Sequence, residues 1–171
     1  MYRSVSGLER KSGVLMHISS LWGEYSSGSF GKEAFEFIDF LKSSGFSYWQ
    51  VLPFVIPDEC NSPYKSYSAF SGNPFFIDLN KLEKQGLITK AELKAATQET
   101  PYSCEFDRLQ KERFILLKQA ASRFKDKSAI EEFRIKYPHT DNFCRFMALK
   151  EVNEDKEWYD WTVDTPNEVT L

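Results

Sequence analysis

Apolar residues gather in two short continuous runs near the start of the chain. The first is SGVLMHI at residues 12–18, and the second is SYWQVLP at residues 47–53, ended by its proline. Runs of this length predict strands, and their nearly continuous apolar character is typical of a parallel sheet buried on both faces.

The segment between the two runs has the pattern of an amphipathic helix. Apolar side chains recur at every third or fourth position over residues 32–44, at Ala34, Phe37, Ile38 and Leu41. Gly45 suits the position that follows a helix C-terminus. A strand, a helix and a strand in close succession predict a βαβ unit, in which the two strands are parallel and the crossover is right-handed.

The pattern changes to a mostly helical one after the second run. Residues 73–87 are predicted to hold a short strand and a helical turn, and a capping box from Thr89 to Glu92 opens the next helix. A long helix is expected from Phe106 to about Lys125, with one apolar stripe. Its members are Phe114, Leu117, Ala121 and Phe124.

Two further helices are predicted toward the end of the chain. A second capping box, Ser128 to Glu131, opens a helix that stops near Pro138. Thr140 is expected to cap the last helix, which runs to about Asn153. The tail after it has no periodicity.

Two strands are too few for a stable parallel sheet, which needs further strands and a cover on both faces. The fold class is therefore predicted as α/β, as the opening βαβ part of an incomplete barrel or doubly wound sheet. Residues 1–78 are assigned to the start of that domain, and residues 79–171 to a mostly helical insertion subdomain with a tail. The chain is expected to be a piece of a larger protein.

Composition and charge exclude several classes of function. A net charge of −3 and a pI near 5.5 argue against a nucleic-acid partner, which requires a basic surface. The sequence shows no signal peptide and no run that could span a membrane. The three cysteines are far apart and have no metal-ligand spacing, so reduced thiols, no metal, no cofactor and a cytoplasmic location are expected.

Candidate chemistry lies in the loops that follow the two predicted strands, because parallel α/β folds bind ligands beyond the C-terminal strand ends. The second loop contains CNSPYKSYSAF at residues 60–70, which combines aromatic residues with serines. Sugars need flat apolar faces and short hydroxyl or amide groups, and this stretch supplies both. By composition alone, a purely structural loop that covers an edge of the core is favoured over a sugar-binding one, and both interpretations stay open at this point.

Other polar and aromatic residues carry weaker signals. His17 ends the first strand beside two serines, but a lone histidine is more often structural than catalytic. Trp158 and Trp161 resemble a pair of aromatic residues on which a sugar stacks, although we expect them to pack on the last helix instead. The strand-end loops contain three carboxylates, Glu24, Asp58 and Glu59. Their spacing does not mark a catalytic pair.

Several longer motifs resemble a known family. The segments SGVLMHISSL, SFGKEAFEFIDFLKSSG, YWQVLP, NSPYKSYSAFSGNPFFIDL and FMALKE stand in the order and spacing of the 4-alpha-glucanotransferases of glycoside hydrolase family 77. The resemblance covers residues 11–161. It implies a (β/α)8 barrel with helical insertions, and transfer of α-1,4-glucan segments between malto-oligosaccharides by a retaining mechanism.

The resemblance also implies site residues. Tyr64 is expected to line the sugar site next to the scissile bond, with Ser62 beside it. Trp49 and Gln50 lie on the second strand, which leads to that site. Asn73 belongs to the substrate-site motif and is expected to fix the loop.

Departures from the family pattern bear on the function. The family's nucleophile follows an Arg-x-Asp pattern, which these 171 residues do not contain, so no catalytic residue is assigned here. Trp22 and Glu59 also depart from the family's loop residues and indicate a divergent member. The interpretation is an N-terminal fragment of a glucanotransferase that is inactive alone. The alternatives are a non-catalytic glucan-binding or regulatory remnant, and a helical interaction protein.

Overall fold

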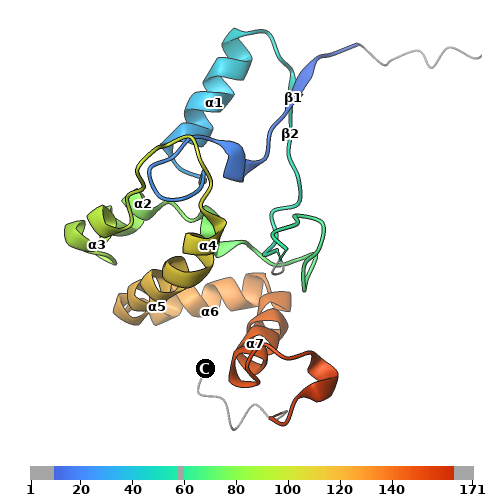
Figure 1. Cartoon of the computed structure of the whole chain (residues 1–171), viewed down its shortest axis with the longest axis vertical. Coiled ribbons are helices and arrows are strands. Elements are labelled where there is room, and N and C mark those ends of the chain that lie inside the picture. The colour runs from blue at the N-terminus through green and yellow to red at the C-terminus, as the bar shows by residue number, and fades with distance from the viewer. Residues whose placement is uncertain (1–9, 58–59, 164–171) are drawn as a thin grey trace, which may run out of the picture.

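A strand, a helix and a second strand open the part of the chain that the structure describes. This computed structural model describes residues 10–57 and 60–163 (Figure 1). Strand β1 spans Gly13–Leu15, helix α1 spans Lys32–Ser43 and strand β2 spans Tyr48–Gln50. The strands pair in parallel, with Gly13 opposite Tyr48. The predicted parallel βαβ unit is therefore confirmed.

The two strands are shorter and more exposed than their apolar runs predict. Each has three residues, and within each strand only the central side chain is half-buried. Val14 and Trp49 face α1 and pack against the core, whereas Leu15 and Tyr48 are exposed. The prediction of burial on both faces is wrong for this chain, because among the described residues a helical layer covers one face of the sheet.

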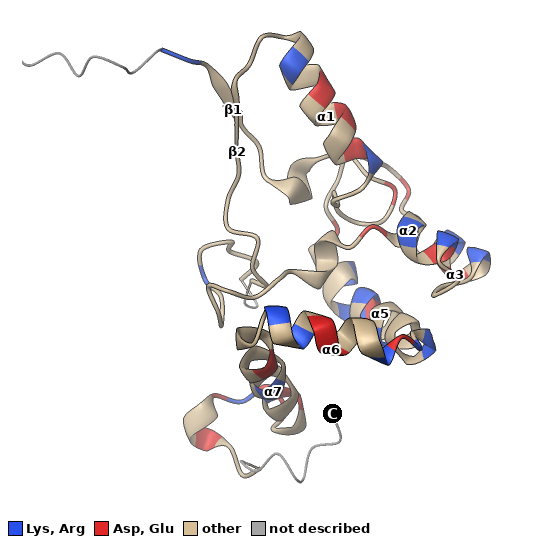
Figure 2. Ribbon diagram, turned by 180° about the vertical axis from the view of Figure 1, so that it is seen from behind, with Lys and Arg blue, Asp and Glu red and all other residues tan. Residues whose placement is uncertain are grey.

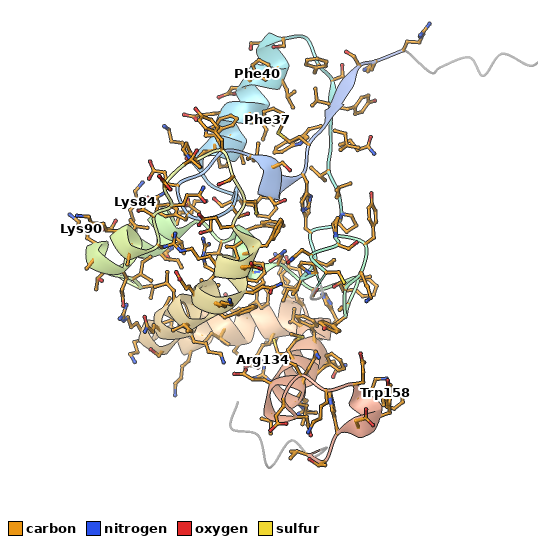
Figure 3. The ribbon with its side chains drawn as sticks, viewed as in Figure 1. Phe37, Phe40, Lys84, Lys90, Arg134 and Trp158 are labelled. Carbon is orange, nitrogen blue, oxygen red and sulfur yellow. The ribbon has the colours of Figure 1, made fainter. Side chains whose placement is uncertain are left out.

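Helix α1 packs its predicted stripe on the core, with one exception. Ala34, Phe37 and Leu41 are buried, but Ile38 is 46% exposed and lies outside the stripe. Phe37 lies among the core side chains on this helix (Figure 3). The helix ends before Gly45, whose φ of +78° is the left-handed conformation that a glycine adopts without strain.

The rest of the described chain is helical. The α-helices are α2 Leu79–Lys84, α3 Lys90–Ala95, α4 Phe106–Arg108, α5 Phe114–Arg123, α6 Lys127–Lys136 and α7 His139–Val152. The short 3-10 turns are Ile18–Ser20, Pro74–Phe76 and Trp158–Asp160, and a π-turn spans Leu109–Arg113. The short strand predicted within residues 73–87 is absent from this described segment, where the 3-10 turn Pro74–Phe76 and helix α2 stand instead. The capping box of α3 is confirmed, because Thr89 and Glu92 each accept the other's backbone N–H.

The long helix predicted from Phe106 is interrupted by the π-turn. Helices α4 and α5 flank this turn, and α5 ends at Arg123. A π-turn holds more residues than an α-helical turn, so it rotates the face that follows. The residues buried along this segment are accordingly Leu109, Arg113 and Ala120. The predicted stripe is wrong as a buried face, since Phe114 and Leu117 are half-buried and Ala121 and Phe124 are exposed.

The last two helices each begin one residue before their predicted cap. Asp126, not Ser128, caps α6, because its carboxylate accepts the backbone N–H of Ala129 at 3.0 Å. The Ser128 hydroxyl donates to that carboxylate at 2.7 Å. Thr140 is not the cap of α7 but lies in its first turn, after Pro138.

The tail after α7 folds back on the last helix through one of its two tryptophans. The ring of Trp161 lies 5.3 Å from that of Phe146 on α7, which confirms packing on the last helix for this tryptophan. Trp158 is exposed at the end of the molecule far from α1 (Figure 3). No helix in the described ranges is long and apolar enough to cross a membrane.

The helical segments share a core with the βαβ unit. The larger cluster of buried side chains draws on the turn after β1, on α1, on the turn before α2 and on the π-turn. Its members are Ile18, Leu21, Ala34, Phe37, Leu41, Phe75, Phe76 and Leu109. A smaller cluster contains Leu79, Ile88 and Ala120. Leu109 therefore ties the helical segment directly to the strand ends.

Candidate functional site

A pocket of about 400 Å³ lies beyond the C-terminal ends of the two strands. Residues 17–31 form the loop after β1, called the β1 loop here, and residues 51–73 form the β2 loop. Both contribute to the pocket, and residues 102–109 of the helical segment form its third wall. This is the edge of the sheet at which parallel α/β folds bind ligands.

The lining combines aromatic rings with neutral polar groups. Phe75, Phe76 and Phe106 contribute rings, and the polar groups are hydroxyls and amides. These polar residues are Ser19, Ser20, Ser27, Asn61, Asn73 and Ser103. No Asp or Glu is among the described residues that line the pocket. The arrangement can bind a neutral polyol, but it holds no acid–base pair that could cleave one.

Few charged side chains lie near the pocket among the described residues. Lys, Arg, Asp and Glu residues lie mainly on the helices, whereas the described part of the β2 loop is nearly uncharged (Figure 2). Lys65 is the single charged residue among the described residues of that loop, and the predicted candidates Asp58 and Glu59 lie outside the described residues. A neutral ligand fits this surface better than a phosphate or a nucleic acid.

Asn73 fixes the end of the β2 loop. Its amide donates to the carbonyl of Val55 at 3.1 Å, and its side-chain oxygen accepts the backbone N–H of Phe75 at 2.9 Å. One side chain thus joins the start of the loop to the turn that follows it. The loop-fixing role expected of Asn73 agrees with these contacts, and the residue also lines the pocket.

Replacing Asn73 by alanine is expected to lower the free energy of unfolding by about 1–2 kcal/mol, because a cap and a loop hydrogen bond are lost together. Asn73→Asp is the matched control. It keeps the acceptor for the N–H of Phe75 but has no amide to donate to Val55, so a smaller loss is expected. Urea unfolding monitored by fluorescence measures both variants. An alanine variant as stable as the unchanged protein would contradict the assigned role.

His17 lies in the pocket wall at the end of β1. Its ring stacks near Phe54, with centroids 6.1 Å apart, and meets Phe76 edge-on at 5.3 Å. Nδ1 is buried and has no hydrogen-bond partner among the described residues. Burial lowers the pKa of His17 below 6.5, which favours the neutral imidazole at neutral pH. The ring contacts match the structural role expected of this histidine.

Tyr64 and Ser62 lie at the tip of the β2 loop rather than in the pocket lining. The Ser62 hydroxyl accepts the backbone N–H of Tyr64 at 3.4 Å, and its carbonyl accepts that of Lys65 at 3.1 Å. The Tyr64 ring is 75% exposed. Their neighbours Asn61 and Pro63 do line the pocket, so the loop tip stands at its rim.

The two predicted residues of β2 are placed differently. The indole of Trp49 donates to the carbonyl of Met16 at 2.7 Å, and its ring lies 5.0 Å from Phe37 on α1. Gln50 has an exposed side chain, while its carbonyl accepts the backbone N–H of Met16 at 3.0 Å. The structure does not bring Trp49 or Gln50 together with Tyr64. Trp22, one of the departures from the family pattern, packs 6.5 Å from the ring of Phe37.

The helical segment supplies pocket residues that sequence reasoning missed. Tyr102, Ser103 and Cys104 line the pocket. They are held against the β1 loop by Gln98, whose amide donates to the carbonyl of Gly23 at 2.7 Å. No sequence signal links these two positions, which are 75 residues apart.

Arg113 in the π-turn connects the β1 loop to the 3-10 turn that follows the β2 loop. Its guanidinium donates to the carbonyl of Tyr25 in the β1 loop and, at 3.4 Å, to that of Phe75 after the β2 loop. Burial lowers the pKa of Arg113 to about 10, which still leaves it charged at neutral pH. The helical segment thus sets the distance between the β1 loop and this turn.

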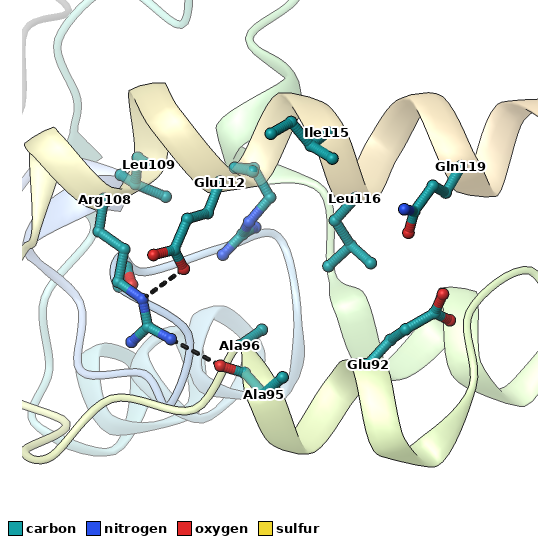
Figure 4. A pocket seen from close by; sticks show the side chains of 11 residues that line it. Glu92, Ala95, Ala96, Arg108, Leu109, Glu112, Ile115, Leu116 and Gln119 are labelled. Carbon is teal, nitrogen blue, oxygen red and sulfur yellow. Dashed lines mark hydrogen bonds and ion pairs between the residues drawn. The ribbon is translucent and has the colours of Figure 1, made fainter.

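A second pocket, of about 210 Å³, lies between α3 and the π-turn with α5 (Figure 4). Its walls are largely aliphatic, and the polar groups at its rim pair with each other. Arg108 bonds Glu112 at 2.8 Å and the carbonyl of Ala95 at 2.6 Å. Since these polar groups already have partners, this pocket offers no comparable set of groups to a ligand.

Comparisons with known proteins agree on one family. A family model described as 4-alpha-glucanotransferase matches residues 16–170. The chain is 38% identical over 159 residues to the 4-alpha-glucanotransferase of Streptococcus pneumoniae serotype 4, covering 90% of this chain and 31% of that protein. It is 36% identical over 161 residues to the enzyme of that name from Thermus thermophilus, covering 90% and 31%.

A solved structure has the same fold. The amylomaltase from Streptococcus agalactiae in complex with acarbose superposes with a TM-score of 0.84 at 33% identity, covering 91% of this chain and 32% of that one. The chain therefore spans about a third of the length of the relatives it matches.

Proposed function

The chain belongs to the 4-alpha-glucanotransferase family, and we propose that its protein transfers α-1,4-glucan segments between malto-oligosaccharides. The observation that carries the proposal is the neutral pocket beyond the strand ends, in which rings and hydroxyl or amide groups meet as a polyol requires. The similarity to an amylomaltase in complex with acarbose supports a sugar ligand at this site.

The residues of this chain would bind and orient the sugar rather than break its bond. The exposed ring of Tyr64 at the rim offers a flat face, and Ser62, which supports its backbone, offers a hydroxyl beside it. Asn73 keeps the loop in place. Trp49 and Gln50 would act through β2, on which the loop is mounted.

The proposed chemistry is that of a retaining glycoside enzyme. An Asp attacks the anomeric carbon and forms a glycosyl ester while a Glu protonates the leaving oxygen, and a second sugar hydroxyl then resolves the ester. The described residues that line the pocket include no carboxylate, and the chain has no Arg-x-Asp pattern, so these groups would come from the two thirds of the family's length that this chain does not match. The 171 residues alone are expected to be inactive.

The domain assignment is part of the same proposal. Residues 1–78 would form the start of a (β/α)8 barrel and residues 79–171 a helical insertion with its tail. The parallel pair of β1 and β2 supports the first part. The exposed side chains of Leu15 and Tyr48 on the second sheet face support it as well, since a barrel covers both faces of its strands. A cytoplasmic location is expected of the enzyme.

Incubation of the full-length protein with maltotriose tests the proposed function. Free glucose and longer malto-oligosaccharides are expected to appear together, because transfer conserves the number of glycosidic bonds. Chromatography of the products measures both. Absence of any product would remove the transferase function. Titration with maltoheptaose would then test the alternative, a non-catalytic glucan-binding or regulatory protein, which predicts binding without turnover.

A further inference from the structure

The β2 loop contacts helix α7 through the aromatic residues Tyr67 and Phe70. The ring of Tyr67 lies 5.9 Å from that of Phe146, and the ammonium of Lys150 lies 5.2 Å from the centroid of the Tyr67 ring. Phe146 and Lys150 stand four residues apart and so share one face of the helix. This face of α7 therefore meets the loop that carries Tyr64.

Lys150 is buried, which is unusual for a lysine. It is 8% exposed, and its ammonium donates to the carbonyl of Asp155 just after the helix. The carboxylate of Asp155 is 3.8 Å away and is itself largely exposed. A buried ammonium needs compensating partners, and here they are a carbonyl on one side and the face of an aromatic ring on the other.

The segment after α7 is folded so that these partners stay in place. Glu154 and Asp155 both have positive φ, at 57° and 59°, which turns the chain back at the end of the helix. The buried Asn153 then holds the returning segment, because its side-chain oxygen accepts the backbone N–H groups of Thr162 at 2.9 Å and of Val163 at 3.1 Å. The returning segment thereby holds the carbonyl of Asp155 against the ammonium of Lys150, which in turn lies over the ring of Tyr67.

On the other side of this contact lies the β2 loop, whose backbone carries Tyr64. Ser66, next to Tyr67, forms an isolated antiparallel bridge with Pro57 across the base of the loop. A second contact, between the rings of Phe70 and His139 at 6.0 Å, holds the far side. Tyr64 is mostly exposed, so the position of its ring depends on the anchored backbone around it.

We propose that Lys150 is a positioning residue that, by holding the ring of Tyr67, sets the place of Tyr64 in the sugar site. The proposal rests on the proposed function for its effect on catalysis and on the contacts above for its structural part. It assigns a role to the last helix that the pocket itself does not show, since neither Lys150 nor Tyr67 lines it.

Kinetics of the full-length protein test the role. Lys150→Met keeps an unbranched apolar side chain, one atom shorter, but removes the charge, and it is expected to lower kcat/KM for maltotriose about tenfold. Lys150→Arg keeps a cation for the ring and is expected to stay within about threefold of the unchanged protein. Tyr67→Leu and Tyr67→Phe form the matched pair on the other side, with the same order of effects.

A double variant separates positioning from a general loss of structure. If Lys150 acts through Tyr64, then Lys150→Met in a Tyr64→Ala background is expected to cost less than about twofold further. A full tenfold loss in both backgrounds would overturn the proposal, since the two residues would then act independently.

A measurement without substrate keeps this inference apart from the proposed function. Backbone amides of residues 60–71 are expected to exchange hydrogen faster in Lys150→Met than in Lys150→Arg, because the loop loses its anchor. Equal exchange in the two variants would overturn the anchoring role. Faster exchange together with an unchanged protein that transfers no glucan would support the anchor and reject the transferase.

Discussion

Replacing Tyr64 by alanine is expected to lower kcat/KM for glucan transfer by about 100-fold while leaving the midpoint of thermal unfolding nearly unchanged. The ring is 75% exposed, so its removal costs little buried surface. Its place at the rim of a neutral pocket gives it a sugar to contact. A large kinetic effect with a small thermal effect is therefore the signature of a binding role.

Two controls sharpen this experiment. Tyr64→Phe keeps the ring and removes the hydroxyl, so it separates stacking from hydrogen bonding. Tyr159→Ala removes a similarly exposed tyrosine, at 67%, from the turn after α7, and it is expected to leave transfer unchanged. Equal rates for Tyr64→Ala and the unchanged protein would remove Tyr64 from the site.

Replacing Gly28 by alanine is expected to destabilise the fold by at least about 3 kcal/mol. A Cβ at Gly28 would lie 2.0 Å from the carbonyl oxygen of Ile18 and 2.8 Å from the Cβ of Leu21. Both contacts belong to the turn after β1, and the two residues are buried in the larger core cluster. The β1 loop can accept the methyl group only by moving its backbone, which would open the pocket wall.

Gly72→Ala is the matched control in the β2 loop. No atom lies within 4 Å of a Cβ built at this glycine. Because alanine restricts the unfolded chain, this variant is expected to be neutral or more stable by up to about 1 kcal/mol. Thermal unfolding of both variants gives the comparison. A Gly28→Ala protein that unfolds at the temperature of Gly72→Ala would show that the β1 loop is looser than its contacts indicate.

The opening of the fold could be predicted from the sequence because its signals are local. Helix α1 follows from the spacing of Ala34, Phe37 and Leu41, and the parallel strands follow from two apolar runs with a helix between them. The capping box of α3 likewise depends on residues three positions apart. Such local signals mislead where two nearby residues can both cap the same helix. Asp126 lies two residues before Ser128 and accepts the backbone N–H of Ala129 in the first turn of α6.

The candidate site could be predicted only in part. The β2 loop was located by its motif, and Asn73 by its place in that motif, because both act within about 20 residues. Trp49 could not be placed from the sequence. An aromatic residue on a strand that leads to a site can face either the ligand or the core, and the local sequence pattern is the same in both cases. Here its indole packs on α1, and a binding role through direct contact stays a prediction.

By itself, the sequence determined the βαβ start, the stretch rich in serine and aromatic residues after its second strand and the family that shares these motifs. Tertiary structure decided which segments meet. Gln98 holds the third wall of the pocket against a loop 75 residues earlier, Arg113 joins the β1 loop to the turn before α2, and Lys150 contacts the ring of Tyr67. These contacts depend on how helices pack, which in turn depends on a π-turn that shifts one buried face. Local residue patterns specify the elements, but long-range packing decides which side chains share a site.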